Sequence, residues 1–357
     1  MSRRDTGVIL VIIILMLLVR APLAPHTSGS DIAQFAGFAD TFLRHHLCFF
    51  KYTGSGNFFD EGWPYPWPYV YGPGLILFLS MLRMIVSSPI THYHDRFGYH
   101  VLIPTEWILA TKSLFISFDI LAALMIYLIV RSFGYTRRTA SLLTSLYAFN
   151  PVSIYISSIY GMFDQIPLFF FLAGVYLLYL DKGNNHETRN GILGSFLTGI
   201  SVAFKQTFLA PFLIILYDIL LRKSGKIKKV TLIIAMLLGI LILFIPFLMA
   251  CPDSIASFLK TSLSSTRPIY NNVVLPYNFN GITNLVVYIH AHAGKNYYSL
   301  LSYWWIPAMI LIESILVVYI KYRDPLVFSG LSYIVFMATY WRINYQYLVP
   351  ALGFTVI

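Results

Sequence analysis

The chain has 357 residues, of which 57% are hydrophobic and 11% are charged, and its mean hydropathy is +0.69. A soluble domain carries about 25% charged residues, so this composition excludes a water-soluble globular protein and indicates one that crosses a membrane several times. The net charge of +10 does not indicate nucleic-acid binding, because the basic residues are divided among short loops between apolar segments.

The first apolar segment, residues 7–22, is predicted to be a membrane helix. Arg3 and Arg4 precede it, as in a secretory signal peptide, but Pro22 and Pro25 interrupt the small-residue stretch where cleavage would occur. We therefore expect an uncleaved anchor with a cytoplasmic N-terminus.

Further apolar segments of membrane length follow at 107–130, 139–159, 163–180, 230–250, 301–320 and 325–340. A last, shorter segment occupies 343–357. Segment 70–88 has a short apolar core and suits a re-entrant piece as well as a span. Segment 190–221 is interrupted by Lys205 and Gln206, so it is either two short helices or one tilted helix.

The placement of Lys and Arg helps to choose between these arrangements. If 70–88 does not cross and 190–221 crosses twice, four basic loops lie with the N-terminus, at 131–138, 181–190, 222–229 and 321–324. The positive-inside rule favours this arrangement over one that places loop 131–138 outside. In both arrangements residues 23–69 and 251–300 face away from the cytoplasm. We expect a single all-α polytopic membrane domain with about 9–11 transmembrane helices, with residues 70–250 as its helical bundle and residues 301–357 as its C-terminal helices.

The two outer segments are long enough to be functional rather than merely connecting. Residues 62–69 of the first are rich in tryptophan, tyrosine and proline, and the alternative for these aromatic residues is a belt at headgroup depth. Cys48 and Cys251 fall one in each outer segment. A disulfide between them is one alternative, which two isolated cysteines do not decide.

Asp31 lies just beyond the first membrane segment, at the start of a predicted helix over residues 31–43 that would lie on the membrane surface. Ser28 or Ser30 could cap this helix. The carboxylate is either an ordinary first-turn acid favoured by the helix dipole or the general base of a membrane enzyme. Asp40 points in another direction around the helix and is expected on a solvated face.

Polar side chains at membrane depth are costly and are candidates for function. We expect Asp119 and Glu313 to pair or to cap helix ends. Four others fall near segment ends, where water can reach them: Asp164, Gln165, Lys205 and Gln206. Arg267 and Arg342 are outward-facing cations, although Arg342 could simply snorkel.

Five short elements occur in the order found in GT-C membrane glycosyltransferases, which use polyprenyl-phosphate sugars. In this chain they occupy residues 30–34, 67–75, 150–165, 203–206 and 267–274. The chain most resembles the ALG glucosyltransferases that use dolichyl-phosphate-glucose, and next the GPI mannosyltransferase I family. It departs from their pattern where Asn271 and Asn272 replace an acidic pair and Gly72 replaces a proline, so the identity of the acceptor is not carried over.

The resemblance implies an inverting transfer of a hexose, mannose or glucose, from a polyprenyl-phosphate donor to a hydroxyl of a lipid-linked or lipid acceptor on the extracytoplasmic face. A lipid phosphate is a good leaving group, so one base suffices, and cations stabilise the charge that builds on the departing phosphate. Asp31 is expected as the base, and Lys205, Arg267 and Arg342 as the ligands of the donor phosphate. The expected substrate-binding residues are Tyr71, Asp164, Gln165, Gln206, Asn271 and Asn272.

Two other classes of function stay open. A flippase for lipid-linked sugars predicts broken helices and internal repeats, and the sequence shows one break, at Lys205, and no repeat. A non-catalytic subunit of a glycosylation complex would tolerate the loss of Asp31. The chemistry requires no metal, but Asp31, Asp40 and Asp60 could hold a divalent cation if they converged.

Overall fold

The computed structural model describes residues 3–180, 187–265, 281–293, 298–341 and 343–357. The elements of the first half are α1 (Arg3–Arg20), α2 (Ser30–His45), α3 (Phe58–Glu61), α4 (Pro73–Ile85), β1 (Thr91–Asp95), β2 (Gly98–Leu102), α5 (Thr105–Ser132), α6 (Arg137–Ala148), α7 (Pro151–Ile154) and α8 (Gln165–Val175). The second half contains α9 (Glu187–Phe204), α10 (Leu209–Leu221), α11 (Lys226–Ala250), α12 (Pro252–Ser265), α13 (Ile282–Ala293), α14 (Trp305–Tyr322), α15 (Pro325–Thr339) and α16 (Leu348–Thr355). Short 3₁₀ segments occupy His46–Tyr52, Ser55–Asn57, Gln206–Phe208, Tyr298–Tyr303 and Tyr345–Tyr347, and π-helical segments occupy Tyr155–Tyr160 and Tyr176–Leu180.

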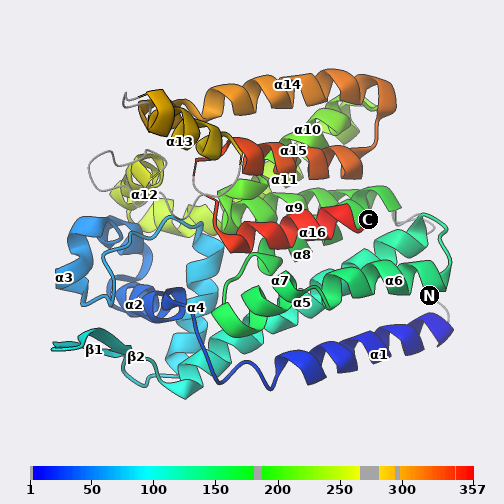
Figure 1. The fold of residues 1–357 in the computed structure, drawn as a ribbon. Coiled ribbons are helices and arrows are strands. Elements are labelled where there is room, and N and C mark those ends of the chain that lie inside the picture. The colour runs from blue at the N-terminus through cyan, green and yellow to red at the C-terminus, as the bar shows by residue number, and fades with distance from the viewer. Residues whose placement is uncertain (1–2, 181–186, 266–280, 294–297, 342) are drawn as a thin grey trace.

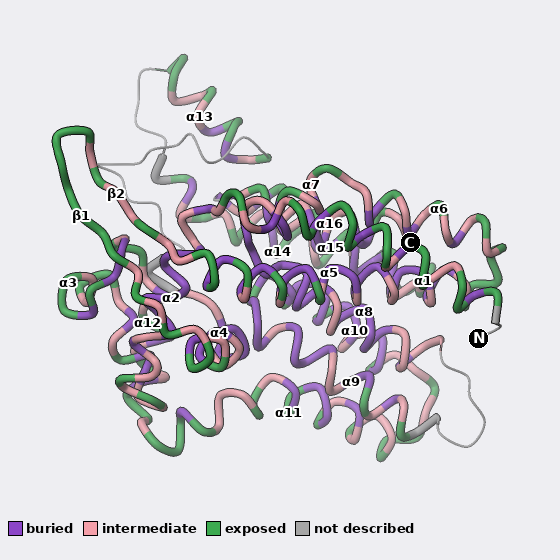
Figure 2. The backbone as a smooth tube through the Cα atoms, turned by 90° about the horizontal axis from the view of Figure 1, so that it is seen from below, coloured by how far each residue is buried: buried purple, intermediate pink, exposed green. Residues whose placement is uncertain are grey.

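Most long helices run side by side in one direction, and the remaining elements gather at one end of them. In Figure 1, α1, α5, α8 and α9 lie lengthwise, whereas α4 stands across them. The elements α2, α3, α12, α13 and the β1–β2 hairpin lie at the end where α4 crosses, which we call the loop end. The N-terminus lies at the opposite end. Figure 2 shows the hairpin projecting from the loop end, largely exposed.

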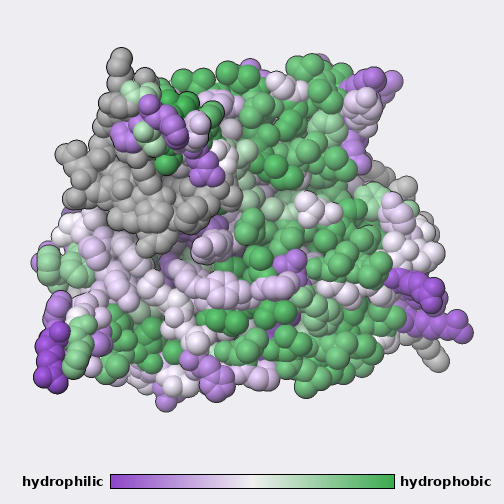
Figure 3. Space-filling model, in the orientation of Figure 1, coloured by the Kyte–Doolittle hydropathy of each residue, from purple (hydrophilic) through white to green (hydrophobic). Residues whose placement is uncertain are grey.

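The protein is an all-helical membrane protein apart from this hairpin, as the composition predicts. Within the described ranges, three helices are long and apolar enough to cross a membrane, namely α5, α11 and 300–322 with α14, or up to four if the bent pair α6 and 151–160 is one span. Apolar residues cover the middle of the face in Figure 3, and the most hydrophilic ones gather at its two ends. Fewer helices reach full length than the 9–11 crossings expected, because breaks divide several apolar segments into shorter helices.

Two of these breaks bear on the ambiguous segments. Segment 190–221 forms two helices, α9 and α10, with the interruption at Lys205. Segment 70–88 forms only the 13-residue α4, which lies across the long helices in Figure 1 and is seen end-on in Figure 2. This arrangement supports the topology that the basic loops favour, in which 70–88 does not cross and 190–221 crosses twice.

Helix starts follow the local sequence. Pro73, Pro151 and Pro325 each occupy the first turn of a helix, where the missing N–H costs nothing. The side chain of Asn150 caps α7 by accepting from the N–H of Val152 at 2.9 Å. The Asn150–Pro151 junction also bends the chain by 50° between α6 and the following helix.

Helix α2 differs from its prediction in three respects. Its N-cap is Gly29 and no side chain caps it, so the expected serine cap is wrong. Its residues 32–39 are buried on every face, so α2 does not lie on a membrane surface. Asp40 is not simply solvated, because Arg83 of α4 donates to both of its carboxylate oxygens at 2.6 and 3.0 Å.

A disulfide and a polar network each join parts of the chain that are far apart in sequence. Cys48 and Cys251 form a disulfide with their Cα atoms 5.2 Å apart, which joins the segment after α2 to the start of α12. This settles the alternative that the sequence left open. The β1–β2 hairpin was not predicted, although Tyr93, Tyr99 and Val101 alternate with histidines in residues 91–102.

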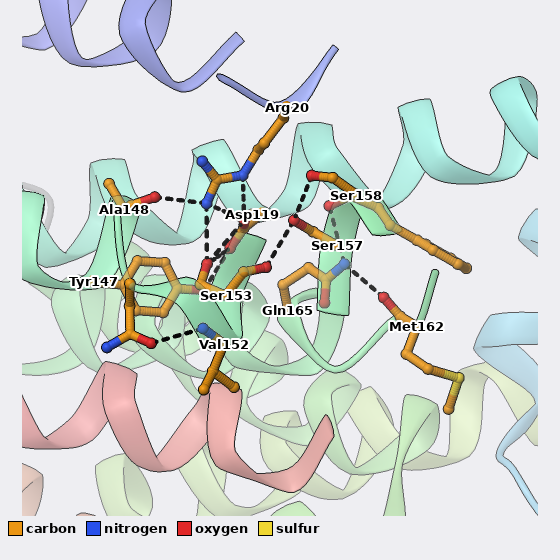
Figure 4. A network of polar contacts seen from close by, with 12 residues as sticks. Arg20, Asp119, Tyr147, Ala148, Val152, Ser153, Ser157, Ser158, Met162 and Gln165 are labelled. Atoms are coloured by element: carbon orange, nitrogen blue, oxygen red, sulfur yellow. Dashed lines mark hydrogen bonds and ion pairs between the residues drawn. The ribbon is translucent and has the colours of Figure 1, made fainter. Parts of the chain in front are cut away.

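The polar network connects α1 to α5, α6 and α7 (Figure 4). The fully buried guanidinium of Arg20 bonds Asp119 at 2.8 Å, and Asp119 also accepts from Tyr147 at 2.8 Å and from Ser153 at 3.1 Å. Asp119 therefore has the structural role expected of it. Glu313 does not, because it is exposed on α14 rather than paired.

Candidate functional site

The carboxylate of Asp31 lies in the first turn of α2 and faces the turn that follows 155–160. The hydroxyl of Tyr160 donates to its Oδ2 atom at 2.7 Å. Asp31 is half-buried, so it is reachable yet held in place. A carboxylate at a helix N-terminus with a donor fixed on it is oriented for proton abstraction.

Two glycines allow this approach of α2 to the 155–160 segment. The N–H of Gly29 donates to the carbonyl oxygen of Tyr160 at 2.7 Å. Gly161 has φ +86°, and a Cβ there would lie 2.6 Å from the side chain of Ile32. The motif around Asp31 and the motif that begins at Asn150 are therefore in direct contact, as their shared membership of one site requires.

Lys205 lies at the break between α9 and α10 and forms a buried ion pair. Its Nζ atom is 2.5 Å from Oδ1 of Asp164, and both side chains are at most 2% exposed. The ammonium also lies over aromatic rings, 4.4 Å from the centroid of Tyr347 and 5.1 Å from that of Phe163. Phe35, one turn after Asp31 on α2, meets Phe163 edge-on with ring centroids 6.0 Å apart, so the ring that contacts Lys205 also packs against the helix that carries Asp31.

The ion pair is unusual because one oxygen of its carboxylate lacks a hydrogen bond to the part of the chain that the structure describes. Oδ2 of Asp164 is buried and has no hydrogen-bond partner among the described residues. A buried ion pair seldom stabilises a fold more than apolar packing would. Fold stability alone therefore does not account for this pair.

The motif at 67–75 packs on the motif at 203–206. The N–H of Gly72 donates to the carbonyl oxygen of Phe204 at 3.2 Å, and a Cβ on Gly72 would lie 1.9 Å from the carbonyl oxygen of Ala203. Gln206 donates to the carbonyl oxygen of Val70 at 2.9 Å. This contact places Tyr71 beside the site, with its ring centroid 6.0 Å from Nζ of Lys205.

Gln165 differs from its expected role as a substrate ligand. Its side-chain amide is fully buried and donates to the carbonyl oxygens of Met162 at 2.7 Å and Phe115 at 3.2 Å. These bonds fix the turn that carries Asp164. Gln206 is exposed and remains accessible to a substrate.

Four of the predicted residues lie outside the described residues, namely Arg267, Asn271, Asn272 and Arg342. Among the described residues, no three His, Cys, Asp or Glu side chains gather as a metal site. Asp31, Asp40 and Asp60 therefore do not converge on one position.

The sequence did not single out two aromatic neighbours of Asp31. Tyr160 lies within the third motif, residues 150–165, but is 129 residues from Asp31, so only the fold joins them. Tyr65 lies in the aromatic segment 62–69, and partial burial, followed by the charge of Asp31, raises its pKa above the usual range.

Comparison with known proteins shows the family and the fold of the chain. The sequence model of glycosyltransferase family 87 matches residues 69–343, which is more than half of the chain. No functionally curated protein matches the chain.

Two solved structures have a similar fold. The structure of ArnT from Cupriavidus metallidurans bound to undecaprenyl phosphate matches with a TM-score of 0.55 and 12% identity, over 99% of this chain and 58% of that one. The oligosaccharyltransferase AglB from Archaeoglobus fulgidus, in complex with an inhibitory peptide and a dolichol-phosphate, matches with a TM-score of 0.55 and 12% identity, over 99% of this chain and 50% of that one. This chain thus spans little more than half the length of these proteins, and shares with them the GT-C membrane fold.

Proposed function

Because this chain belongs to glycosyltransferase family 87, we propose that it transfers a hexose, mannose or glucose, from a polyprenyl-phosphate donor to an acceptor hydroxyl with inversion. The observation that carries the proposal is that Phe163 contacts the buried Lys205 and also packs on Phe35, one turn after Asp31; we propose Asp31 as the base and Lys205 as the cation. The lipid phosphates bound in these two solved structures, undecaprenyl phosphate and a dolichol-phosphate, support a donor of this class. We place the reaction on the extracytoplasmic face, at the loop end of the bundle.

In the proposed reaction, Asp31 takes the proton of the acceptor hydroxyl as its oxygen bonds to the anomeric carbon. The bond from that carbon to the phosphate oxygen breaks, and its electron pair leaves with the lipid phosphate. No general acid is needed, because phosphate carries the resulting charge readily. Attack from the side opposite to the phosphate inverts the configuration of the sugar.

Lys205 acts on the leaving phosphate. In the structure Asp164 and the rings of Phe163 and Tyr347 neutralise and surround the ammonium. An ammonium held away from water interacts strongly with charge that develops nearby. The phosphate would share Lys205 with Asp164, and Arg267 and Arg342 remain proposed as additional ligands.

The test is sugar transfer by the purified protein in lipid vesicles. Polyprenyl-phosphate mannose and polyprenyl-phosphate glucose are offered as labelled donors, with a mixed native lipid extract as the acceptor. We expect Asp31→Asn to lower transfer roughly 10²-fold or more, as for loss of a general base. The matched control is Asp60→Asn, because Asp60 is an exposed acid in the same outer segment.

Equal transfer by wild type and Asp31→Asn would remove Asp31 from the mechanism. Transfer by neither protein, combined with movement of the labelled lipid across the vesicle wall, would instead favour a flippase.

A further inference from the structure

Three aromatic side chains form an exposed platform at the loop end, and none of them has been given a role. The rings of Tyr65 and Trp67 are stacked, with centroids 4.7 Å apart and an interplanar angle of 13°. Tyr99 of β2 meets Tyr65 edge-on at 6.1 Å. Trp67 and Tyr99 are each 41% exposed, so the platform offers aromatic surface to a ligand.

The platform is attached to the helix that carries Asp31. The buried side chain of Gln34, one turn after Asp31, accepts from the N–H of Tyr65 at 3.1 Å and donates to the carbonyl oxygen of Trp67 at 2.9 Å. Residues three apart on a helix share a face, so this clamp sets the platform on the side of α2 that carries the carboxylate. The hydroxyl of Tyr99 donates to the carbonyl oxygen of Pro64 and ties the hairpin to the same segment.

The platform and Lys205 are separate neighbours of Asp31. Gln34 holds the platform one turn after Asp31, and Phe35 of the same turn packs on Phe163, the ring that contacts Lys205. Lys205 is buried in the bundle, whereas Trp67 and Tyr99 are exposed at its end. If the donor phosphate lies at Lys205, the platform is left for the acceptor.

An aromatic belt at headgroup depth would be the ordinary explanation for exposed tryptophan and tyrosine. Two observations distinguish this platform from a belt. A belt residue needs no clamp to a helix that carries a catalytic carboxylate. The hairpin that contributes Tyr99 is also polar, with all five residues of β1 exposed, so this edge of the platform borders a hydrophilic surface (Figure 3).

We propose that the Tyr65–Trp67–Tyr99 platform binds a sugar ring of the acceptor, which is therefore a glycan rather than a protein or a lipid alcohol. One face of a hexopyranose presents mainly C–H groups, and it can stack on Trp67 while its polar edge meets water and Asp31. Aromatic rings supply a large, rigid apolar surface with directional edges, which suits this contact. The inference rests on the proposed function and adds to it the class of acceptor.

The first test uses the vesicle assay with varied concentrations of lipid extract. Trp67→Ala should raise the KM for the extract about tenfold, in line with the loss of one aromatic contact and its buried area, and leave the KM for the donor unchanged. Trp67→Phe should restore most of the affinity. The backbone bond from Gln34 persists in both variants, since it uses the carbonyl group of residue 67. The control is Trp305→Ala, which removes a similarly exposed tryptophan from α14.

Periodate treatment of the extract before donor addition supplies the second readout, since it cleaves the vicinal diols of sugars. Wild-type transfer should be lost with the treated extract. Unchanged transfer to treated extract, or a Trp67→Ala variant with the wild-type KM, would overturn the proposal.

A binding measurement separates this proposal from the proposed function. If wild type transfers no sugar, saturation-transfer NMR with millimolar methyl α-mannopyranoside and methyl β-glucopyranoside is decisive. Ring-proton signals that Trp67→Ala removes and Trp305→Ala keeps would support the platform without catalysis. No signal with either sugar on the wild type would overturn it.

Discussion

The hydroxyl of Tyr160 donates a 2.7 Å hydrogen bond to the carboxylate of Asp31, across 129 residues of sequence. The bond links the start of α2 to the turn that leads into α8. It orients the proposed base and favours its charged form. The predictions below begin with this contact.

Tyr160→Phe should shift the acidic limb of the pH–activity profile to higher pH. The carboxylate loses a donor that stabilises its charged form, so it takes up a proton at a higher pH. A hydrogen bond to a charged group contributes about 1.5–3 kcal/mol, which corresponds to about one pH unit or more. The measurement is transfer rate against pH, and the control is Tyr155→Phe, which alters an exposed neighbouring ring. An unchanged acidic limb would contradict a role for Tyr160.

Lys205→Met should reduce both activity and stability, and a second substitution should separate the two effects. Removal of one partner leaves the buried Asp164 uncompensated, at a cost of about 3–5 kcal/mol. The double variant Lys205→Met with Asp164→Leu should regain much of the lost Tm. It should remain inactive, because the phosphate still lacks its cation. A double variant with recovered transfer would show that the pair serves only the fold.

Gly72→Ala should destabilise the site, because a Cβ would lie 1.9 Å from the carbonyl oxygen of Ala203. The backbone must shift to relieve this overlap, which typically costs about 1–3 kcal/mol. The shift would also move Tyr71 away from Lys205. Gly225→Ala is the matched control, since nothing lies within 4 Å of its added Cβ. Tm in detergent and transfer rate should fall for the first variant and stay unchanged for the second.

Removal of the Cys48–Cys251 disulfide tests both the stability of the protein and the side of the membrane on which the loop end lies. Loss of a crosslink that closes so long a loop typically costs about 2–4 kcal/mol. The double variant Cys48→Ser with Cys251→Ser should therefore have a lower Tm than the wild type under oxidising conditions and the same Tm under reducing conditions. Peptide mapping of protein from native membranes should find the crosslink, since disulfides persist on the oxidising side of a membrane. Free thiols at both positions in native membranes would contradict an outward-facing loop end.

The fold was largely predictable because membrane helices appear in a sequence as long runs of apolar residues. The interruption of 190–221 by Lys205 and Gln206 correctly marked a helix break, since a charge inside an apolar run needs an end or a partner. The short α4 was recognised as ambiguous for the same reason. The hairpin was missed although Tyr93, Tyr99 and Val101 alternate with histidines in residues 91–102. Its register pairs Tyr93 with His100 and His94 with Tyr99, so neither face is apolar and no buried face marks it.

The site was predictable in its residues but not in its pairings. The sequence identified Asp31, Asp164 and Lys205 by their positions near segment ends. It did not predict that Asp164 and Lys205 form an ion pair, that Tyr160 donates a hydrogen bond to Asp31, or that Arg83 pairs with Asp40. Each of these contacts joins residues at least 41 positions apart, and local periodicity carries no information on such distances.

The Arg20 network bears on the order in which the protein can be assembled during synthesis. Arg20 is the last residue of α1, yet its partners are Asp119, Ala148 and Ser153, which are translated roughly a hundred or more residues later. A lone guanidinium is costly in lipid, so the nascent α1 must keep this end near the headgroups until α5 to α7 have entered the membrane. The first helix therefore reaches its final position late, after the segment that carries Asp119 has been inserted.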